Sequence, residues 1–136
     1  MPPTIERRLL ILVSAVLETG TGLSLLLLPR FVVRMLLGAE LVGAGVAASR
    51  LCGVALISLG LACWPESEPP LHRTDRRAVR ALLVYNASAT AYLGCLLAFD
   101  GYRGILLVPA IVIHAVLAAL VARMVAGFRR RPIENA

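Results

Sequence analysis

Four strongly polar side chains stand out because each lies near the middle of a long hydrophobic stretch. They are Glu18, Arg50, Asn86 and His114. An ionisable side chain at the centre of a bilayer costs about 2.5–3.5 kcal/mol on insertion scales, so it normally faces the interior of a helix bundle and has a partner there. One such residue in each stretch, at similar depth, predicts a shared polar site inside a membrane protein.

Glu18 and Arg50 carry opposite charges, and an ion pair between them would reduce the cost of placing each in lipid. The pair has two interpretations. It either fixes the register of two helices, or it belongs to a binding site. In the second case Arg50 holds an anionic or carbonyl group and Glu18 acts as its counter-ion or as a proton carrier. The sequence leaves both interpretations open.

The remaining polar residues are suited to hydrogen bonding. Asn86 is typical of side chains that join membrane helices. A lone His114 is expected to be a neutral hydrogen-bonding residue, although its titration near neutral pH also suits a proton relay beside Glu18. Thr90 lies one turn beyond Asn86 and either bonds its own helix backbone or belongs to the site. Tyr85 either adds a hydroxyl to the site or faces the membrane interface.

Motifs for metals, cofactors and catalysis are weak in this sequence. One histidine and one glutamate are too few ligands for a metal site. Cys52, Cys63 and Cys95 form no C-x-x-C pair and are expected to be small buried hydrophobes. We therefore expect no metal and no cofactor. An enzyme would have to use Glu18 and His114 as acid and base, without a nucleophile motif.

Composition places these residues in a membrane. Hydrophobic residues make up 59% of the chain, whereas soluble domains have about 45–50%. The net charge of +6 comes from fourteen arginines and no lysine, a usage that suggests a GC-rich bacterial genome. Most arginines adjoin the hydrophobic stretches, which is typical of topology signals and headgroup contacts. This distribution argues against a nucleic-acid partner.

The hydrophobic stretches are long enough to cross a bilayer, which takes about 20 apolar residues. We predict an all-α, membrane-embedded four-helix bundle with short loops, in a single domain that covers residues 1–136. The first stretch is longer than the core of a typical signal peptide and contains Glu18, so we expect it to stay as a helix. The expected spans are approximately residues 9–28, 41–64, 78–99 and 105–126.

The connection between the first two spans has two interpretations. Pro29 ends the first span, and Arg30 and Arg34 are four residues apart, so they share one helical face. Residues 30–37 are therefore either a short amphipathic helix in the membrane interface or an extension of the second span. Pro109 is expected in the first turn or two of the fourth span.

The second span has small residues at intervals of four. Gly45, Ser49 and Gly53 follow this spacing, which lets two helix backbones approach closely. We therefore expect the second helix to be the most tightly packed. The order of polar residues also suggests two helical hairpins related by an axis along the membrane normal.

The arginines predict an orientation. Cytoplasmic segments carry an excess of basic residues, and the connections near residues 30–34 and at Arg103 have few. We expect both termini and the central loop to lie in the cytoplasm of a bacterial inner membrane. The basic segments that support this orientation are residues 7–8, 73–80 and 129–131.

Several short segments resemble recurring pieces of small bacterial four-helix membrane proteins, broadly of the DoxX-like kind. This resemblance implies the fold and the membrane location only. Small multidrug-resistance transporters are similar in having four helices and a membrane-embedded glutamate in the first, where Glu18 lies, but Arg50 has no counterpart in them. The segments that carry the DoxX-like resemblance are Leu17–Leu23, Ser49–Ala55, Leu61–Trp64, Val84–Asn86 and Val108–Ala110 with His114 after it.

These features predict a protein that binds a small polar or amphipathic molecule inside the bundle, as a transporter-like or ligand-binding subunit. A structural or assembly subunit of a larger membrane complex and a proton-coupled exporter of small molecules are the alternatives. The expected partners are the lipid bilayer, a small-molecule ligand, and either further copies of this chain or other subunits. The predicted site consists of Glu18, Arg50, Asn86, His114 and Thr90.

Overall fold

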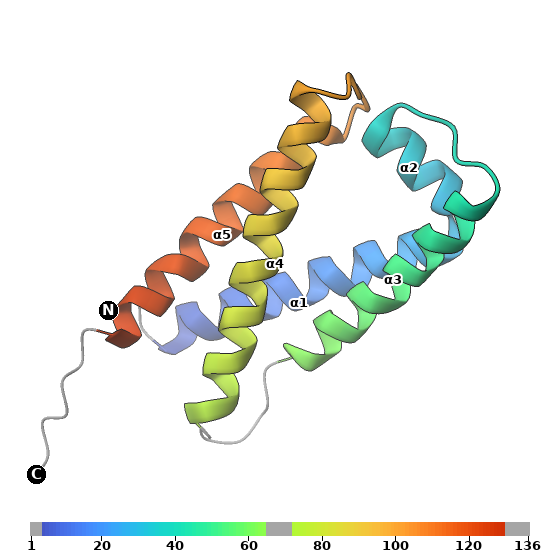
Figure 1. Ribbon diagram of the computed structural model, residues 1–136. Helices are drawn as coiled ribbons and strands as arrows, with labels where there is room; N and C mark the ends of the chain where they lie inside the picture. Colours follow the sequence, from blue (N-terminus) through green and yellow to red (C-terminus); the bar gives the residue numbers. More distant parts are fainter. Residues whose placement is uncertain (1–3, 65–71, 130–136) are drawn as a thin grey trace, which may run out of the picture.

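The structure is a computed structural model that describes residues 4–64 and 72–129, with side chains described for residues 8–64 and 77–126. These residues form only α-helices and their connections. Four of the helices are long and apolar enough to cross a membrane, as judged by length and composition. This confirms the expected all-α architecture. The helices are α1 (Thr4–Leu27), α2 (Pro29–Leu37), α3 (Ala44–Ala62), α4 (His72–Ala98) and α5 (Leu107–Arg129) (Figure 1).

The segment after the first span forms a helix of its own. α1 ends at Leu27 and α2 begins at Pro29. Proline fits the first position of a helix, because a backbone N–H at that position would have no partner within the helix and its absence costs nothing. α2 ends at Gly38, which adopts a left-handed φ of 72° and donates its N–H to the carbonyl of Arg34 at 2.9 Å. Arg30 and Arg34 are both exposed. Residues 30–37 therefore belong to a separate amphipathic helix and do not extend the second span.

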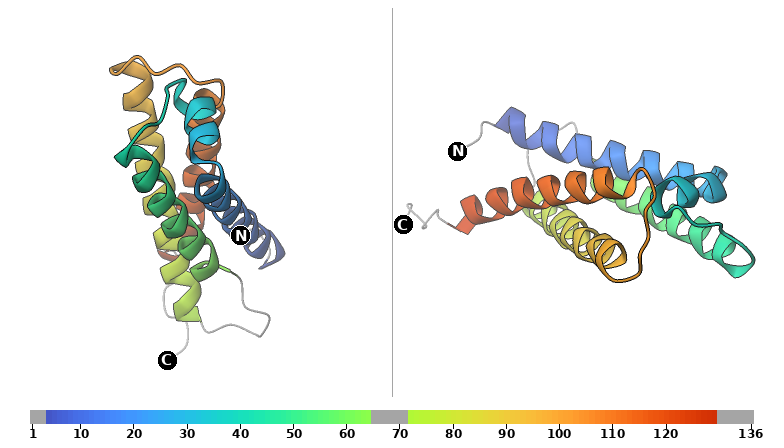
Figure 2. Two further views of the ribbon diagram at one scale, coloured as in Figure 1. Left: turned by 90° about the vertical axis from the view of Figure 1, so that its right-hand side faces the viewer. Right: turned by 90° about the horizontal axis from the view of Figure 1, so that it is seen from above.

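The four long helices pair as two hairpins. α1 lies against α3, and α4 lies against α5. Figures 1 and 2 show that the two hairpins cross near one end of the molecule and diverge toward the other, where α2 lies between them. We call the first the core end and the second the α2 end. The core end carries the first turns of α1 and α4 and the last turns of α3 and α5.

The hydrophobic core lies at the core end. Its buried side chains come from both hairpins, so this cluster holds the two hairpins together. On α1, α4 and α5 the polar residues singled out in the sequence lie one or two turns from these core residues, whereas Arg50 on α3 lies more than three turns from Cys63. The core residues are Ile11, Cys63, Val79, Leu82, Val121 and Met124.

Glycines set the spacing between α1 and α3. A Cβ added to Gly22 would lie 2.6 Å from the carbonyl oxygen of Gly53, and one added to Gly53 would lie 2.6 Å from that of Gly22. Gly60 is also buried and packs on the α1 backbone at Ala15. The close approach expected for the second span is therefore present at Gly53. It continues toward Gly60, whereas a Cβ on Gly45 would meet only the side chain of Leu41.

The turn between α4 and α5 is attached to α2. The N–H of Arg103 donates to the carbonyl of Leu37 at 3.2 Å, and the N–H of Leu106 donates to that of Met35 at 2.9 Å. The last carbonyls of a helix have no partner within it, so these bonds satisfy the end of α2. Gly104 packs directly on the Leu36 backbone, where a Cβ would clash. The α2 end thus has its own link between the two hairpins.

Candidate binding site at the crossing of the hairpins

A hydrogen bond joins Asn86 of α4 to His114 of α5. The side-chain oxygen Oδ1 of Asn86 lies 2.9 Å from Nδ1 of His114. The side-chain nitrogen Nδ2 of Asn86 donates to the carbonyl of Leu82 at 2.8 Å. Asn86 is fully buried and so fulfils the expected role of a residue that joins two membrane helices.

The Leu82 carbonyl fixes the tautomer of His114 through Asn86. A carbonyl only accepts, so the atom of Asn86 that faces Leu82 is the amide nitrogen, and its oxygen is the atom that faces His114. An amide oxygen also only accepts, so Nδ1 of His114 carries a proton. In a neutral imidazole the other nitrogen, Nε2, then keeps its lone pair.

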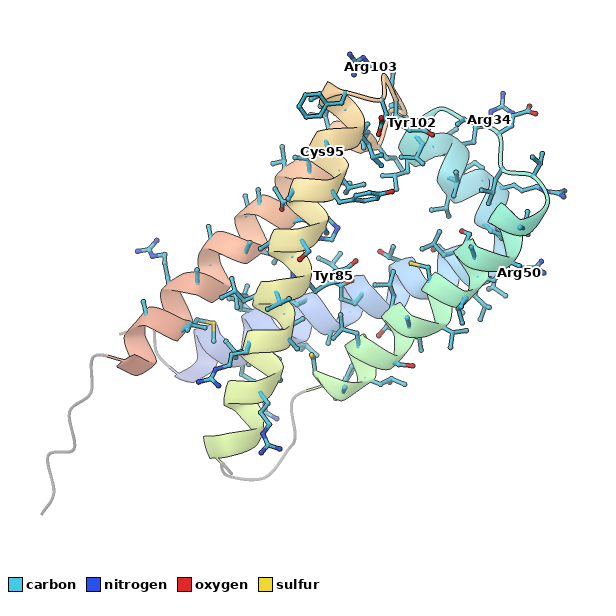
Figure 3. The ribbon with its side chains drawn as sticks, viewed as in Figure 1. Arg34, Arg50, Tyr85, Cys95, Tyr102 and Arg103 are labelled. Carbon is cyan, nitrogen blue, oxygen red and sulfur yellow. The ribbon has the colours of Figure 1, made fainter. Side chains whose placement is uncertain are left out.

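Tyr85 connects this pair to α1. Its ring makes an edge-to-face contact with the imidazole of His114, with centroids 5.6 Å apart and planes at 80°. Its hydroxyl interacts with the carboxyl group of Glu18. Figure 3 shows Tyr85 on α4 at the place where α4 passes over α1. The structure therefore places Tyr85 in the polar cluster, whereas Tyr92 is 65% exposed.

Glu18 is buried without a full set of partners. Its side chain is 1% exposed, and Oε1 has no hydrogen-bond partner among the described residues. Ser14, one turn earlier on the same helix face, is completely buried, and its hydroxyl also lacks a partner there. An unpaired buried polar atom costs about 1–3 kcal/mol, and a charged one costs more. Ser14 was not among the predicted site residues, although its spacing from Glu18 places it on the same face.

Thr90 does not contribute its hydroxyl to the cluster. Its Oγ1 donates to the backbone carbonyl of Asn86 at 2.8 Å. Of the two roles that the sequence left open, the structure shows the bond to the helix's own backbone. Thr90 thus supports the helix around Asn86 and does not point a free hydroxyl at a ligand.

Arg50 lies outside the cluster, and the structure does not support the predicted ion pair with Glu18. In the antiparallel α1–α3 hairpin, Gly22 packs beside Gly53. Glu18 precedes Gly22 by four residues and Arg50 precedes Gly53 by three, so the two side chains start about 10 Å apart along the helix axes at 1.5 Å per residue. Arg50 is also exposed, while Glu18 is buried. Figure 3 shows Arg50 on α3, far from Tyr85.

The position of Arg50 has a simple physical reason. It lies six residues after Ala44, the first residue of α3, or about 9 Å from that end of the helix. A long arginine side chain on a membrane helix can extend along the surface until its charged group reaches the polar region. Arg50 therefore does not need an acidic partner inside the bundle.

The cluster thus consists of Glu18, Tyr85, Asn86 and His114, with Ser14 beside them. Within residues 8–64 and 77–126, no three histidine, cysteine, aspartate or glutamate side chains gather as a metal site would require. Protein-family models, curated proteins and solved structures give no match to this chain. Functional inference therefore depends on the geometry of this cluster.

Proposed function

We propose that this chain is a small integral membrane protein that binds a small polar or amphipathic molecule where its two hairpins cross. It would act as a transporter-like or ligand-binding subunit. The observation that carries this proposal is the carboxyl group of Glu18, which is buried and has an oxygen without a partner in the described part of the chain. Nearby lies the hydrogen-bonded pair of Asn86 and His114.

A ligand site explains this cluster better than a structural role alone. A polar cluster that only locks helices together is most stable when each of its buried atoms is paired. The two atoms that join Asn86 and His114 meet that condition, because each is the partner of the other. Glu18 and Ser14 do not meet it, so their oxygens are available to a molecule that enters the site.

Burial differs among the members of the cluster. Tyr85 and His114 are half-buried, while Glu18 and Asn86 are buried. A ligand that enters the cluster would therefore meet Tyr85 and His114 before Glu18.

The proposed orientation places the core end of the molecule on the cytoplasmic side of a bacterial inner membrane and α2 on the opposite side. The basic segments of the sequence adjoin the first turns of α1 and α4 and the last turn of α5, and the positive-inside rule assigns such segments to the cytoplasm. Association with further copies or with other subunits remains part of this proposal.

Proton-coupled export of a small molecule is the second candidate function. It is favoured by the connection of Glu18 to His114 through Tyr85, because a carboxyl and an imidazole in one cluster can exchange a proton with a substrate. Transport would then stop in Glu18→Gln. A flux into vesicles that does not respond to a proton gradient would contradict the coupling.

Native mass spectrometry of the protein extracted in a mild detergent tests the proposed function. We expect a bound small molecule in the wild type and in Arg50→Gln, which changes an exposed residue outside the cluster, and its loss in Glu18→Gln. Loss of the molecule in Arg50→Gln alone would contradict the site. A wild-type protein without a small molecule, held instead by a stoichiometric second polypeptide, would favour the structural subunit.

A further inference from the structure

We infer that the ligand presents hydrogen-bond donors to this site, and that it is a small apolar molecule with a protonated amine. This inference rests on the proposed function, because it names the chemical class of the ligand for the same cluster. It reverses the sequence-based expectation that Arg50 would hold an anionic or carbonyl group.

The first observation is that the unused groups of Glu18 and His114 are acceptors, while the unpaired hydroxyl of Ser14 can either accept or donate. Oε1 of Glu18 has no partner among the described residues. The bond from Nδ1 of His114 to Asn86 leaves Nε2 of the neutral ring with a free lone pair. Tyr85 interacts with Glu18 and contacts His114, so it holds these two acceptors within one cluster. A ligand that satisfies both must donate.

The second observation is that most donors of the cluster are engaged, the hydroxyl of Ser14 being an exception. The side-chain nitrogen of Asn86 uses one of its two N–H groups for the bond to Leu82, and the hydroxyl of Thr90 donates to the carbonyl of Asn86. The Tyr85 hydroxyl is directed to Glu18. Few groups are left to hold the oxygens of a carboxylate or phosphate, which require several donors.

The third observation concerns charge. Glu18 lies buried on a helix of mostly apolar residues, and the arginines whose side chains the structure describes are exposed. A buried carboxylate without a cation nearby is stabilised by a ligand that brings one and is destabilised by an anion. An ammonium group supplies both a positive charge and three N–H donors. The exposed arginines include Arg50, Arg77, Arg80, Arg103 and Arg123.

The fourth observation concerns the body of the ligand. The long helices expose large apolar side chains, such as Leu17 on α1, Val84 on α4 and Ile113 on α5, each adjacent in sequence to a residue of the cluster. A molecule that reaches the cluster past such surfaces needs an apolar body. A fully hydrated cation would lose its water without compensation along that route.

Three compounds that share one phenyl ring and a short chain test the inference. They are 2-phenylethylamine, 2-phenylethanol and phenylacetate, which present an ammonium, a hydroxyl and a carboxylate. Each is titrated into the detergent-solubilised protein, and the rise in the thermal unfolding midpoint gives an apparent Kd, because a ligand that binds the folded state stabilises it by mass action. Glu18→Gln is the site control, and Arg50→Gln is the control for charge outside the site.

We expect the amine to bind at least tenfold more tightly than phenylacetate, with the alcohol between them. This preference should disappear in Glu18→Gln and persist in Arg50→Gln. If phenylacetate binds as well as the amine and still depends on Glu18, the inferred class is wrong while the proposed function stands. An amine preference that survives in Glu18→Gln would also overturn the inference. If none of the three compounds shifts the midpoint, the inferred class is wrong, and the native mass spectrometry of the wild type and Glu18→Gln decides the proposed function separately.

Discussion

Replacing Gly22 by alanine should destabilise the protein, whereas replacing Gly20 should not. Both glycines lie in α1, but a Cβ on Gly22 would lie 2.6 Å from the carbonyl oxygen of Gly53 and 2.8 Å from the backbone nitrogen of Ile57, and a Cβ on Gly20 would meet nothing within 4 Å. Real Cβ contacts essentially never fall below 3.0 Å. Because both obstructing atoms are backbone, α1 and α3 must move apart to admit the methyl group.

The magnitude follows from two opposing effects. Overpacking of a tight interface costs about 1–3 kcal/mol, while alanine is favoured over glycine inside a helix by about 1 kcal/mol. The second effect is common to both substitutions, so the difference between the two variants isolates the first. Gly22→Ala should therefore be less stable than Gly20→Ala by about 1–3 kcal/mol.

The assay is reversible unfolding in mixed micelles, with an increasing fraction of a denaturing detergent and the helical circular dichroism signal as the readout. Gly53→Ala should show a similar loss, because its Cβ would clash at the same contact with Gly22. The double variant should lose less than the sum of the two single variants, since the helices need to separate only once. If Gly22→Ala is as stable as Gly20→Ala, the close approach of α1 and α3 is refuted.

Three further outcomes are expected. A double-mutant cycle between Asn86→Ala and His114→Ala should give a coupling energy of about 0.6 kcal/mol and at most about 1.7 kcal/mol, as for other hydrogen bonds between membrane helices; additive losses of stability would contradict the bond. Gly104→Ala should speed hydrogen exchange of the amides that bond to the end of α2. Gly94→Ala should leave this exchange unchanged, because a Cβ on Gly94 would meet nothing within 4 Å. Equal exchange protection in the two variants would contradict the attachment of the α4–α5 turn to α2. Arg50→Gln should change the free energy of unfolding by no more than about 0.5 kcal/mol. A much larger loss of stability would indicate that Arg50 forms an ion pair.

Hydropathy was sufficient to predict the long helices, because a span requires about 20 apolar residues whatever its neighbours are. The second span begins at Ala44 rather than at residue 41, since Gly43 adopts a φ of 54° and starts the helix later. α4 begins earlier than the hydrophobic stretch, at His72. α3 thus begins inside its hydrophobic stretch, whereas α4 extends beyond its stretch on the N-terminal side.

The candidate site was only partly predictable, because depth along a helix does not determine which way a residue faces. Glu18, Asn86 and His114 were expected to meet, and contacts through Tyr85 connect them. Arg50 was placed at a similar depth, but the α1–α3 register depends on glycine contacts between two helices. Such contacts cannot be read from either helix alone.

The sequence also did not determine which way Tyr85 faces. Its sequence position allowed either the site or the membrane interface, and the crossing of α4 over α1 decides between them (Figure 3). The link between α2 and the α4–α5 turn could not be predicted at all, because its hydrogen bonds join backbone groups that every residue carries. Only Gly104, at a position that admits no Cβ, gives a sequence signal for it.

The most direct test of the cluster is nitrogen NMR of ¹⁵N-labelled histidine in lipid bilayers. The chain has two histidines, and a His72→Gln background leaves the signals of His114 alone. We predict a neutral ring with the proton on Nδ1, and a change in the Nε2 shift when 2-phenylethylamine is added, in the wild type but not in Glu18→Gln. A proton on Nε2 with a bare Nδ1, or an Nε2 shift that the amine leaves unchanged, would contradict the binding site described for Glu18, Tyr85, Asn86 and His114.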